Sequence, residues 1–116
     1  MEVSRYQKLA SRTLIAGPDF EIPDDKIMIV WNALGLAGEA GEVAELAKKG
    51  VFHQRGIDKD KFKKELGDCL WYIAALCTKL DLDMSEIMRE NIQKLEVRYP
   101  SGYSSADSVK RVDVIE

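Results

Sequence analysis

The sequence has few of the residues that bind soft or redox-active metals: one histidine and two cysteines among 116 residues. The histidine, His53, lies between Gly50 and Gly56 in a stretch that predicts a loop. Carboxylate-bridged di-iron bundles use Glu-x-x-His pairs on helices, so this class of site is disfavoured. Cys69 and Cys77 lie in an apolar helical run, where a thiol usually behaves as a small buried hydrophobe. We expect both to be reduced core residues of a cytoplasmic protein.

Long apolar runs and an excess of positive charge are also missing. No run approaches the roughly 20 apolar residues that cross a bilayer, and Met1 precedes charged, periodic sequence rather than a signal peptide. The net charge of −3 provides no basic field for nucleic acid. Hydrophobic residues at 46% and charged residues at 32% are ordinary for a soluble globular protein. We expect a soluble cytoplasmic protein without membrane or nucleic-acid partners.

What the chain does contain is helical periodicity. Apolar residues recur at helical spacing over residues 2–16, 26–49, 59–80 and 84–99. Gly17-Pro18 ends the first segment, Asp24 or Asp25 can cap the second, and Asp58 can cap the third. Asp83 or Ser85 can cap the fourth. The sequence therefore predicts an all-α fold, a compact four-helix bundle over residues 1–100, followed by a polar tail over 101–116.

The apolar positions of the last two helices should form much of the core. In the third helix they are Phe62, Leu66, Cys69, Leu70, Ile73, Leu76, Cys77 and Leu80, and in the fourth Ile87, Met88, Ile92 and Leu95. A chain of this size buries a modest core, so we expect oligomerisation to complete the bundle.

Three glycines interrupt the second helix. Gly35, Gly38 and Gly41 each cost about 1 kcal/mol of helix stability relative to alanine. Their presence suggests close approach of another helix beside the acidic residues. The alternative is a break in the helix between Gly35 and Gly41.

The candidate functional residues of the sequence are two pairs of acidic residues, Glu39 with Glu42 and Glu65 with Asp68. Residues three apart lie on one helix face, and the short connection between the second and third helices favours an antiparallel pair. The four carboxylates are then expected to converge. Oxygen ligands without histidine or thiolate suit Mg²⁺, with Mn²⁺ as a substitute. Glu45 is a further candidate ligand.

The spacing alone leaves a second interpretation open, because such acidic pairs are common on solvated helix faces. Apolar residues such as Leu36 and Val43 lie close in sequence to Glu39 and Glu42, and Leu66 and Leu70 lie close to Glu65 and Asp68. Polar groups in apolar surroundings require a partner. This context favours the metal site.

The segments GLAGEAGEVAEL (residues 35–46), ELGDCLWY (residues 65–72) and NIQKLEVRYP (residues 91–100) resemble the MazG-type nucleoside triphosphate pyrophosphohydrolases. That family's signature is EExxE, a spacer, then ExxD; here Gly38 replaces the first glutamate of the doublet. The resemblance implies hydrolysis of nucleoside or deoxynucleoside triphosphates to the monophosphate and pyrophosphate, in house-cleaning of the nucleotide pool. It implies Mg²⁺ bound by Glu39, Glu42, Glu65 and Asp68, and a homodimer or homotetramer.

Within that resemblance, Glu42 or Glu39 is expected to position or deprotonate the attacking water. Cationic and amide side chains should bind the phosphates, and an amide and an aromatic ring the base. The candidates for substrate binding are Asn32, Lys49, Tyr72, Asn91, Lys94 and Arg98, and Trp31 and Trp71 are weaker candidates for stacking. For Lys94 and Arg98 a solvated charge pair is the second interpretation once the resemblance is considered. For Lys48, Lys49, His53 and Arg55 in and beside the loop, solvated charge is at least as good an explanation. The competing function is a non-catalytic module that binds nucleotide or metal.

Overall fold

The computed structural model describes residues 1–14 and 24–111, and over these residues the chain is all-α, as the sequence predicts. The helices are α1 (Val3–Ala10), α2 (Asp24–Val51), α3 (Lys59–Lys79), α4 (Met84–Arg98) and α5 (Ser105–Lys110), and a short 3-10 helix, η1, covers Ser11–Thr13. The described residues form no β-strand, and none of their helices is long and apolar enough to cross a membrane. The chain divides into two compact units, Met1–Leu82 and Asp83–Glu116.

The helix boundaries follow local sequence signals closely. The carboxylate of Asp58 accepts the backbone N–H of Lys61 at 3.1 Å and caps α3, as predicted. The carboxylate of Asp83 accepts the N–H of Ser85 at 2.9 Å and caps α4. The continuous second helix is confirmed, since α2 runs without interruption through Gly35 to Gly41, and the alternative of a break there is wrong. The stop at Gly17-Pro18 and the connector before α2 lie outside the described residues, as do the side chains of Asp24 and Asp25.

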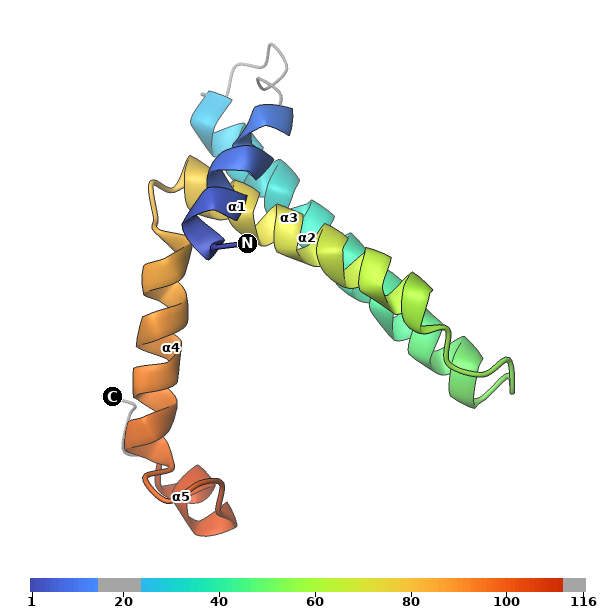
Figure 1. Ribbon diagram of the computed structural model, residues 1–116, viewed down its shortest axis with the longest axis vertical. Helices are drawn as coiled ribbons and strands as arrows, with labels where there is room; N and C mark the ends of the chain where they lie inside the picture. The colour runs from blue at the N-terminus through green and yellow to red at the C-terminus, as the bar shows by residue number, and fades with distance from the viewer. Residues whose placement is uncertain (15–23, 112–116) are drawn as a thin grey trace. The chain divides into compact units, whose positions relative to one another are not determined.

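Helices α2 and α3 form the hairpin on which the first unit is built. They lie side by side and antiparallel along much of their length (Figure 1). Helix α1 packs against α3, and two hydrogen bonds fix this end of the unit. The indole N–H of Trp71 donates to the hydroxyl of Thr13 at 2.8 Å, and the side-chain amide of Gln7 donates to the carbonyl of Leu82 at 2.9 Å. Trp71 is therefore a structural link between α3 and η1.

The buried residues of the first unit are mostly small: Ala10, Met28, Asn32, Ala74, Ala75 and Cys77. Three leucines predicted to be core residues, Leu66, Leu70 and Leu80, are about half exposed, at 50%, 47% and 47%. The prediction was wrong for these three because periodicity does not specify which apolar positions another helix covers. The buried residues of α3 are Ala74, Ala75 and Cys77.

Gly35 permits the close contact between α2 and α3. A Cβ atom at this position would overlap the ring of Tyr72 on α3. The Tyr72 ring is held in turn by Trp71, whose ring it meets edge to face with centroids 5.1 Å apart. The expectation of close packing at the glycines is confirmed at Gly35 but is wrong for Gly38 and Gly41, where an added Cβ meets no described atom within 4 Å.

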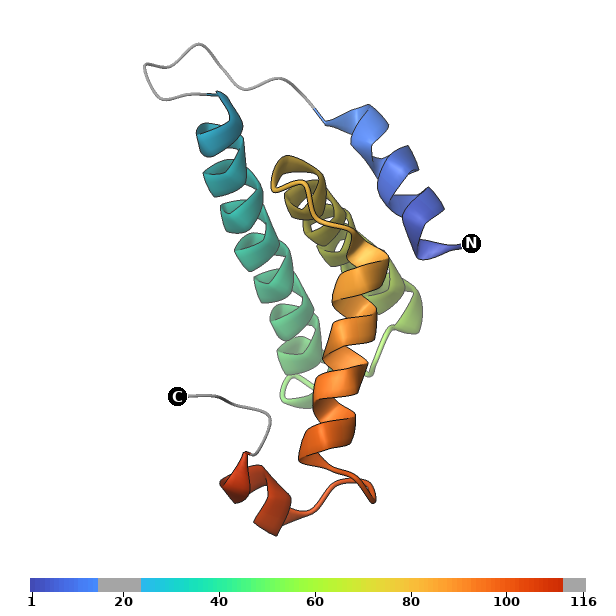
Figure 2. The same ribbon diagram turned by 90° about the vertical axis from the view of Figure 1, so that its left-hand side faces the viewer.

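In the second unit, α4 continues into a turn and the short helix α5 (Figure 2). The hydroxyl of Ser104 accepts the N–H of Asp107 at 3.0 Å and caps α5, so the tail contains a helix that periodicity did not predict. The four residues of α4 predicted to face a core are exposed: Ile87, Met88, Ile92 and Leu95. Within one chain the prediction of burial is wrong for them, because α5 is too short to cover a helix of four turns.

Candidate metal centre

Three carboxylates from two helices meet in the first unit. Glu39 comes from the middle of α2, and Glu65 and Asp68 come from one face of α3. Each offers an oxygen, and these three oxygens all lie within 4.8 Å of one another. Because α2 and α3 are antiparallel and packed closely, residues 26 apart in sequence are neighbours in space. The convergence expected from the two acidic pairs is therefore present for three of its four members.

The electrostatics of Glu39 reflect this crowding. Its pKa is raised above the ordinary value of 4.5, first by a hydrogen bond with the Glu65 side chain, which holds a proton between the two carboxyls. Partial burial and the negative charges of Asp68, Glu65 and Glu42 raise it further. Carboxylates crowded together in this way repel one another, and a bound cation would relieve that repulsion.

The pH dependence of stability should report this repulsion in metal-free protein. Since folding raises the pKa of Glu39, the folded state binds this proton more tightly than the unfolded chain does. The stability contributed by Glu39 is therefore complete below the pKa that Glu39 has in the unfolded chain. It is lost as the pH rises through the higher pKa that Glu39 has in the folded protein. We expect Glu39→Gln to match the wild type at acidic pH and to melt at a higher temperature at neutral pH. The measurement is the melting temperature of both proteins from pH 4 to 8 in buffer that contains a chelator. A difference in melting temperature that does not change with pH would contradict the prediction.

The donor set fits a hard divalent cation. All three groups are carboxylates, and neither Cys69, which is half-buried, nor Cys77, which is buried, belongs to the group. Mg²⁺ binds oxygen at about 2.1 Å, so adjacent ligands of an octahedral ion are about 3.0 Å apart and opposite ligands about 4.2 Å apart. Oxygens within 4.8 Å of one another need only small side-chain rotations to reach that arrangement. The three residues can hold Mg²⁺ or Mn²⁺, leaving positions for water and a ligand.

Glu42 and Glu45, the other acidic residues of this stretch, have different surroundings. Glu42 is exposed and near enough for its charge to raise the pKa of Glu39, although it lies outside the group of three oxygens. Glu45 instead forms ion pairs on its own helix, with Lys49 at 3.6 Å and Lys48 at 4.0 Å. Its carboxylate balances basic residues at the end of α2.

Tyr6 is a neighbour of the cluster that the sequence did not indicate. The pKa of its phenol is raised by burial and by the negative charge of Asp68, so Tyr6 of α1 lies near enough to the acidic cluster for that charge to act on it. In the sequence Tyr6 is one of several apolar positions of a short amphipathic helix. Only the packing of α1 on α3 distinguishes it, so no local signal could have selected it.

The two residues expected to contact a base lie in different environments. Asn32 is buried, 2% exposed, and its side-chain amide donates to the carbonyl of Met28 at 2.7 Å. Tyr72, on α3, is half-buried against Gly35 of α2. Gly35 is four residues before Glu39 in the sequence. The structure therefore places Tyr72 about one helical turn from the acidic cluster, and Asn32 within the core.

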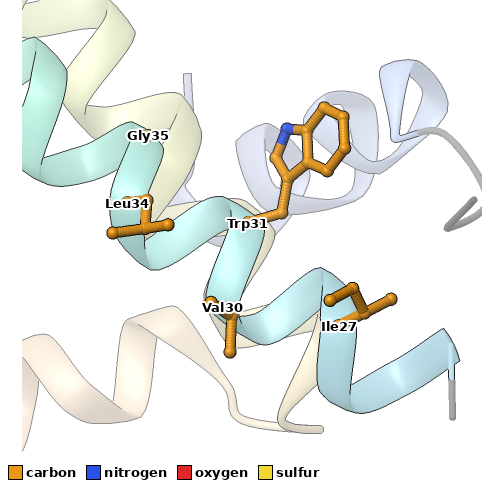
Figure 3. Close-up of a pocket in the computed structure, with 5 residues that line it drawn as sticks. All are labelled: Ile27, Val30, Trp31, Leu34 and Gly35. Atoms are coloured by element: carbon orange, nitrogen blue, oxygen red, sulfur yellow. The ribbon is translucent and has the colours of Figure 1, made fainter. Parts of the chain in front are cut away.

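An apolar hollow of about 470 Å³ extends along α2 from Ile27 to Gly35 (Figure 3). Its remaining lining residues are Val30, Trp31 and Leu34, of which Trp31 is 48% exposed. The four side chains share one face of α2, and in the close-up Ile27 and Trp31 form one edge of the hollow and Val30 and Leu34 the other. The hollow ends at Gly35, which is one helical turn before Glu39 on α2.

The three remaining candidates for substrate binding lie on α4 of the second unit. Asn91 and Lys94 are exposed, and Arg98 is half-buried. The guanidinium carbon of Arg98 lies 5.9 Å from the centre of the Tyr99 ring, a cation–π contact. Their spacing of three and four residues places them on successive turns of α4.

Comparisons with known proteins agree with this arrangement. The family model described as the MazG nucleotide pyrophosphohydrolase domain matches residues 31–103, more than half of the chain. The chain is also 36% identical over 106 residues to the Gene 37 protein of Mycobacterium phage L5, a match covering 88% of this chain and 92% of that protein. The name of the phage protein states no function. No solved structure matches the chain to a significant degree.

Proposed function

Because the chain belongs to the MazG nucleotide pyrophosphohydrolase family, we propose that it hydrolyses nucleoside or deoxynucleoside triphosphates to the monophosphate and pyrophosphate. The observation that carries this proposal is the meeting of Glu39, Glu65 and Asp68 within 4.8 Å. A site of this kind suits the chemistry, since phosphoryl transfer depends chiefly on positioning and on neutralising charge. The proposed role is the removal of unwanted nucleotides from the cellular pool.

The carboxylates have separate tasks in this proposal. Glu39, Glu65 and Asp68 hold Mg²⁺ or Mn²⁺, with Glu42 as a fourth ligand in the loaded site. The bound ion would neutralise the phosphate oxygens and lower the pKa of water. Glu42 is exposed and outside the group of three, which supports it over Glu39 as the carboxylate that orients the attacking water and accepts its proton.

In this proposal the base and the phosphates of the nucleotide substrate are bound by residues beside the metal centre. The apolar hollow ends at Gly35, against which Tyr72 packs, and its volume of about 470 Å³ suits a flat heterocycle. Tyr72 is therefore the proposed contact for the base, and Asn32 shapes this region from within the core. Lys49, Asn91, Lys94 and Arg98 remain proposed phosphate contacts.

The function is tested by incubating the full chain with each of the four ribonucleoside and four deoxynucleoside triphosphates in Mg²⁺ and measuring release of pyrophosphate. We expect monophosphate and pyrophosphate in equal amounts, with a preference for some bases or sugars, and no release in chelator. Metal-dependent nucleotide binding without pyrophosphate release would replace the enzyme by a nucleotide-binding module. Absence of both turnover and binding would overturn the proposal.

We also propose that the protein is a homodimer or a homotetramer. The exposed apolar residues of α3 and α4, including Leu66, Leu70, Ile87 and Ile92, leave much apolar surface uncovered in a single chain. Burying such surface is the usual driving force for association of small helical proteins. Light scattering coupled to size exclusion should give two or four times the mass of one chain. A monodisperse monomer at micromolar concentration would contradict the proposal.

A further inference from the structure

The indole of Trp71 is held by a residue that is distant in the sequence. Its N–H donates a hydrogen bond of 2.8 Å to the hydroxyl of Thr13 in η1, 58 residues earlier. That hydroxyl in turn donates to the carbonyl of Ala10, the last residue of α1, at 3.0 Å. A threonine hydroxyl has one hydrogen to donate, so the bond to Ala10 leaves its lone pairs to accept the indole N–H. The two bonds together fix the position of Trp71 relative to α1 and η1.

The ring of Trp71 also contacts the ring of Tyr72, the next residue on α3. Successive residues on a helix point in directions about 100° apart and do not face each other. Here the ring centroids are nevertheless 5.1 Å apart and the ring planes meet at 89°, an edge-to-face contact. The indole is therefore turned toward Tyr72, and the hydrogen bond from its N–H to Thr13 holds it in that orientation.

Tyr72 is confined by residues of both helices. Its ring lies against Gly35 of α2, where an added Cβ would overlap it, and the edge-to-face contact with Trp71 limits its rotation. Gly35 is also the residue at which the apolar hollow ends. The orientation of the Tyr72 ring therefore depends on Trp71, and through Trp71 on the hydroxyl of Thr13.

We propose that Thr13 is a positioning residue for the nucleotide base. It acts through Trp71 on Tyr72, the proposed contact for the base, so this inference rests on the proposed function. Thr13 precedes residue 31, where the match to the family model begins, so membership of the family does not select it. Its hydroxyl is engaged with Ala10 and Trp71. Its effect is therefore on the affinity for the nucleotide, through the base, and not on the metal-dependent step.

The physical reason for this effect is preorganisation. A side chain that has to be ordered when a ligand binds lowers the affinity, whereas a side chain already held in its bound orientation does not. Tyr72 is half-buried, so its ring has room to turn once Trp71 is released. Loss of the Thr13 hydroxyl should weaken nucleotide binding about three- to tenfold, which is the usual effect of one neutral hydrogen bond.

The test compares Thr13→Val, which removes the hydroxyl at similar volume, with Thr13→Ser, which keeps it. Steady-state kinetics use the full chain, Mg²⁺ and the best substrate among the nucleoside triphosphates. Thr13→Val should raise KM about three- to tenfold with little change in kcat, and Thr13→Ser should stay close to the wild type. Trp71→Phe, which removes the N–H donor, should reproduce Thr13→Val. The matched control is Thr78→Val, because the Thr78 hydroxyl donates to Ala74 within α3, at 3.1 Å.

Two further measurements separate positioning of the base from damage to the fold or to the metal centre. Inorganic tripolyphosphate has phosphates but no base, so its inhibition constant should be the same for Thr13→Val and the wild type. In a Tyr72→Ala background, Thr13→Val should have no further effect on KM, because the residue through which it acts is absent. Additive effects on KM, or an inhibition constant that rises with KM, would overturn the positioning role.

Failure of the positioning role and failure of the proposed function give different results. If the wild type hydrolyses nucleotide and Thr13→Val has the wild-type KM, the positioning role is wrong and the proposed function stands. If the wild type binds nucleotide without turnover, dissociation constants from titration calorimetry replace KM in the same comparison. If the wild type neither binds nor hydrolyses any nucleoside triphosphate, both proposals are wrong. Melting curves of every variant separate loss of affinity from loss of folding.

Discussion

Replacing Glu65 with glutamine or Asp68 with asparagine is expected to lower kcat/KM for nucleoside triphosphate hydrolysis by more than about 100-fold. Substitutions of residues that merely support a metal ligand typically cost about 10- to 100-fold in metal affinity or activity, and these two carboxylates lie in the proposed centre itself. The amide retains the size of the side chain but removes the charge that neutralises a cation. Activity and Mn²⁺ affinity are measured together, the latter by calorimetry.

The matched control is Asp60→Asn, which makes the same change of charge on α3 at an exposed position outside the cluster. It should retain wild-type activity. Glu42→Gln shows which of the two tasks proposed for Glu42 dominates: loss of a residue that acts mainly on water lowers kcat and leaves Mn²⁺ affinity largely intact, whereas loss of a metal ligand lowers both. If Glu65→Gln and Asp68→Asn were as active as Asp60→Asn, the cluster would be a solvated acidic face, and the proposed site would be wrong.

Gly35→Ala is expected to destabilise the protein by about 1–3 kcal/mol, the usual cost of overpacking a well-filled contact. The new methyl group would overlap the ring of Tyr72, which is confined by its edge-to-face contact with Trp71. Gly38→Ala on the same helix is the control, because an added Cβ there meets no described atom. It should be stabilising by up to about 1 kcal/mol through helix propensity. Urea unfolding monitored by circular dichroism measures both.

The cause of the destabilisation can be isolated with a third change. In a Tyr72→Ala background the steric overlap is absent, so Gly35→Ala should become neutral or stabilising. Equal stability changes for Gly35→Ala and Gly38→Ala in the wild-type background would show that the helices adjust without cost. The close approach of α2 and α3 would then be unimportant for stability.

Much of the fold follows from local features of the sequence. Apolar periodicity and capping residues together predict the bounds of α3 and α4 to within one residue. The caps, Asp58 and Asp83, accept hydrogen bonds from backbone N–H groups two or three residues later, so they need no tertiary partner. The small helix α5 was missed, since six residues contain too few apolar positions to show a period. The separation of residues 1–100 from the tail stays a prediction.

The acidic site, like the fold, was predictable from the sequence only in part. Spacing of three on a helix pairs Glu65 with Asp68, and a short connection between long helices brings Glu39 opposite them; both are properties of sequence alone. Spacing does not distinguish Glu45, which follows Glu42 by three residues just as Glu42 follows Glu39. The structure pairs Glu45 with Lys49 and Lys48, because it lies beyond the acidic cluster at the basic end of α2.

The sequence by itself determined that this chain forms helices and where α3 and α4 begin, and it predicted that carboxylates from α2 and α3 converge. Tertiary structure alone decided that Gly35 and not Gly38 meets another helix, that Leu66 is half exposed and that Tyr6 reaches Asp68. The physical reason is that periodicity specifies a face of a helix but not the line along which another helix crosses it. That line depends on the packing of all the side chains together.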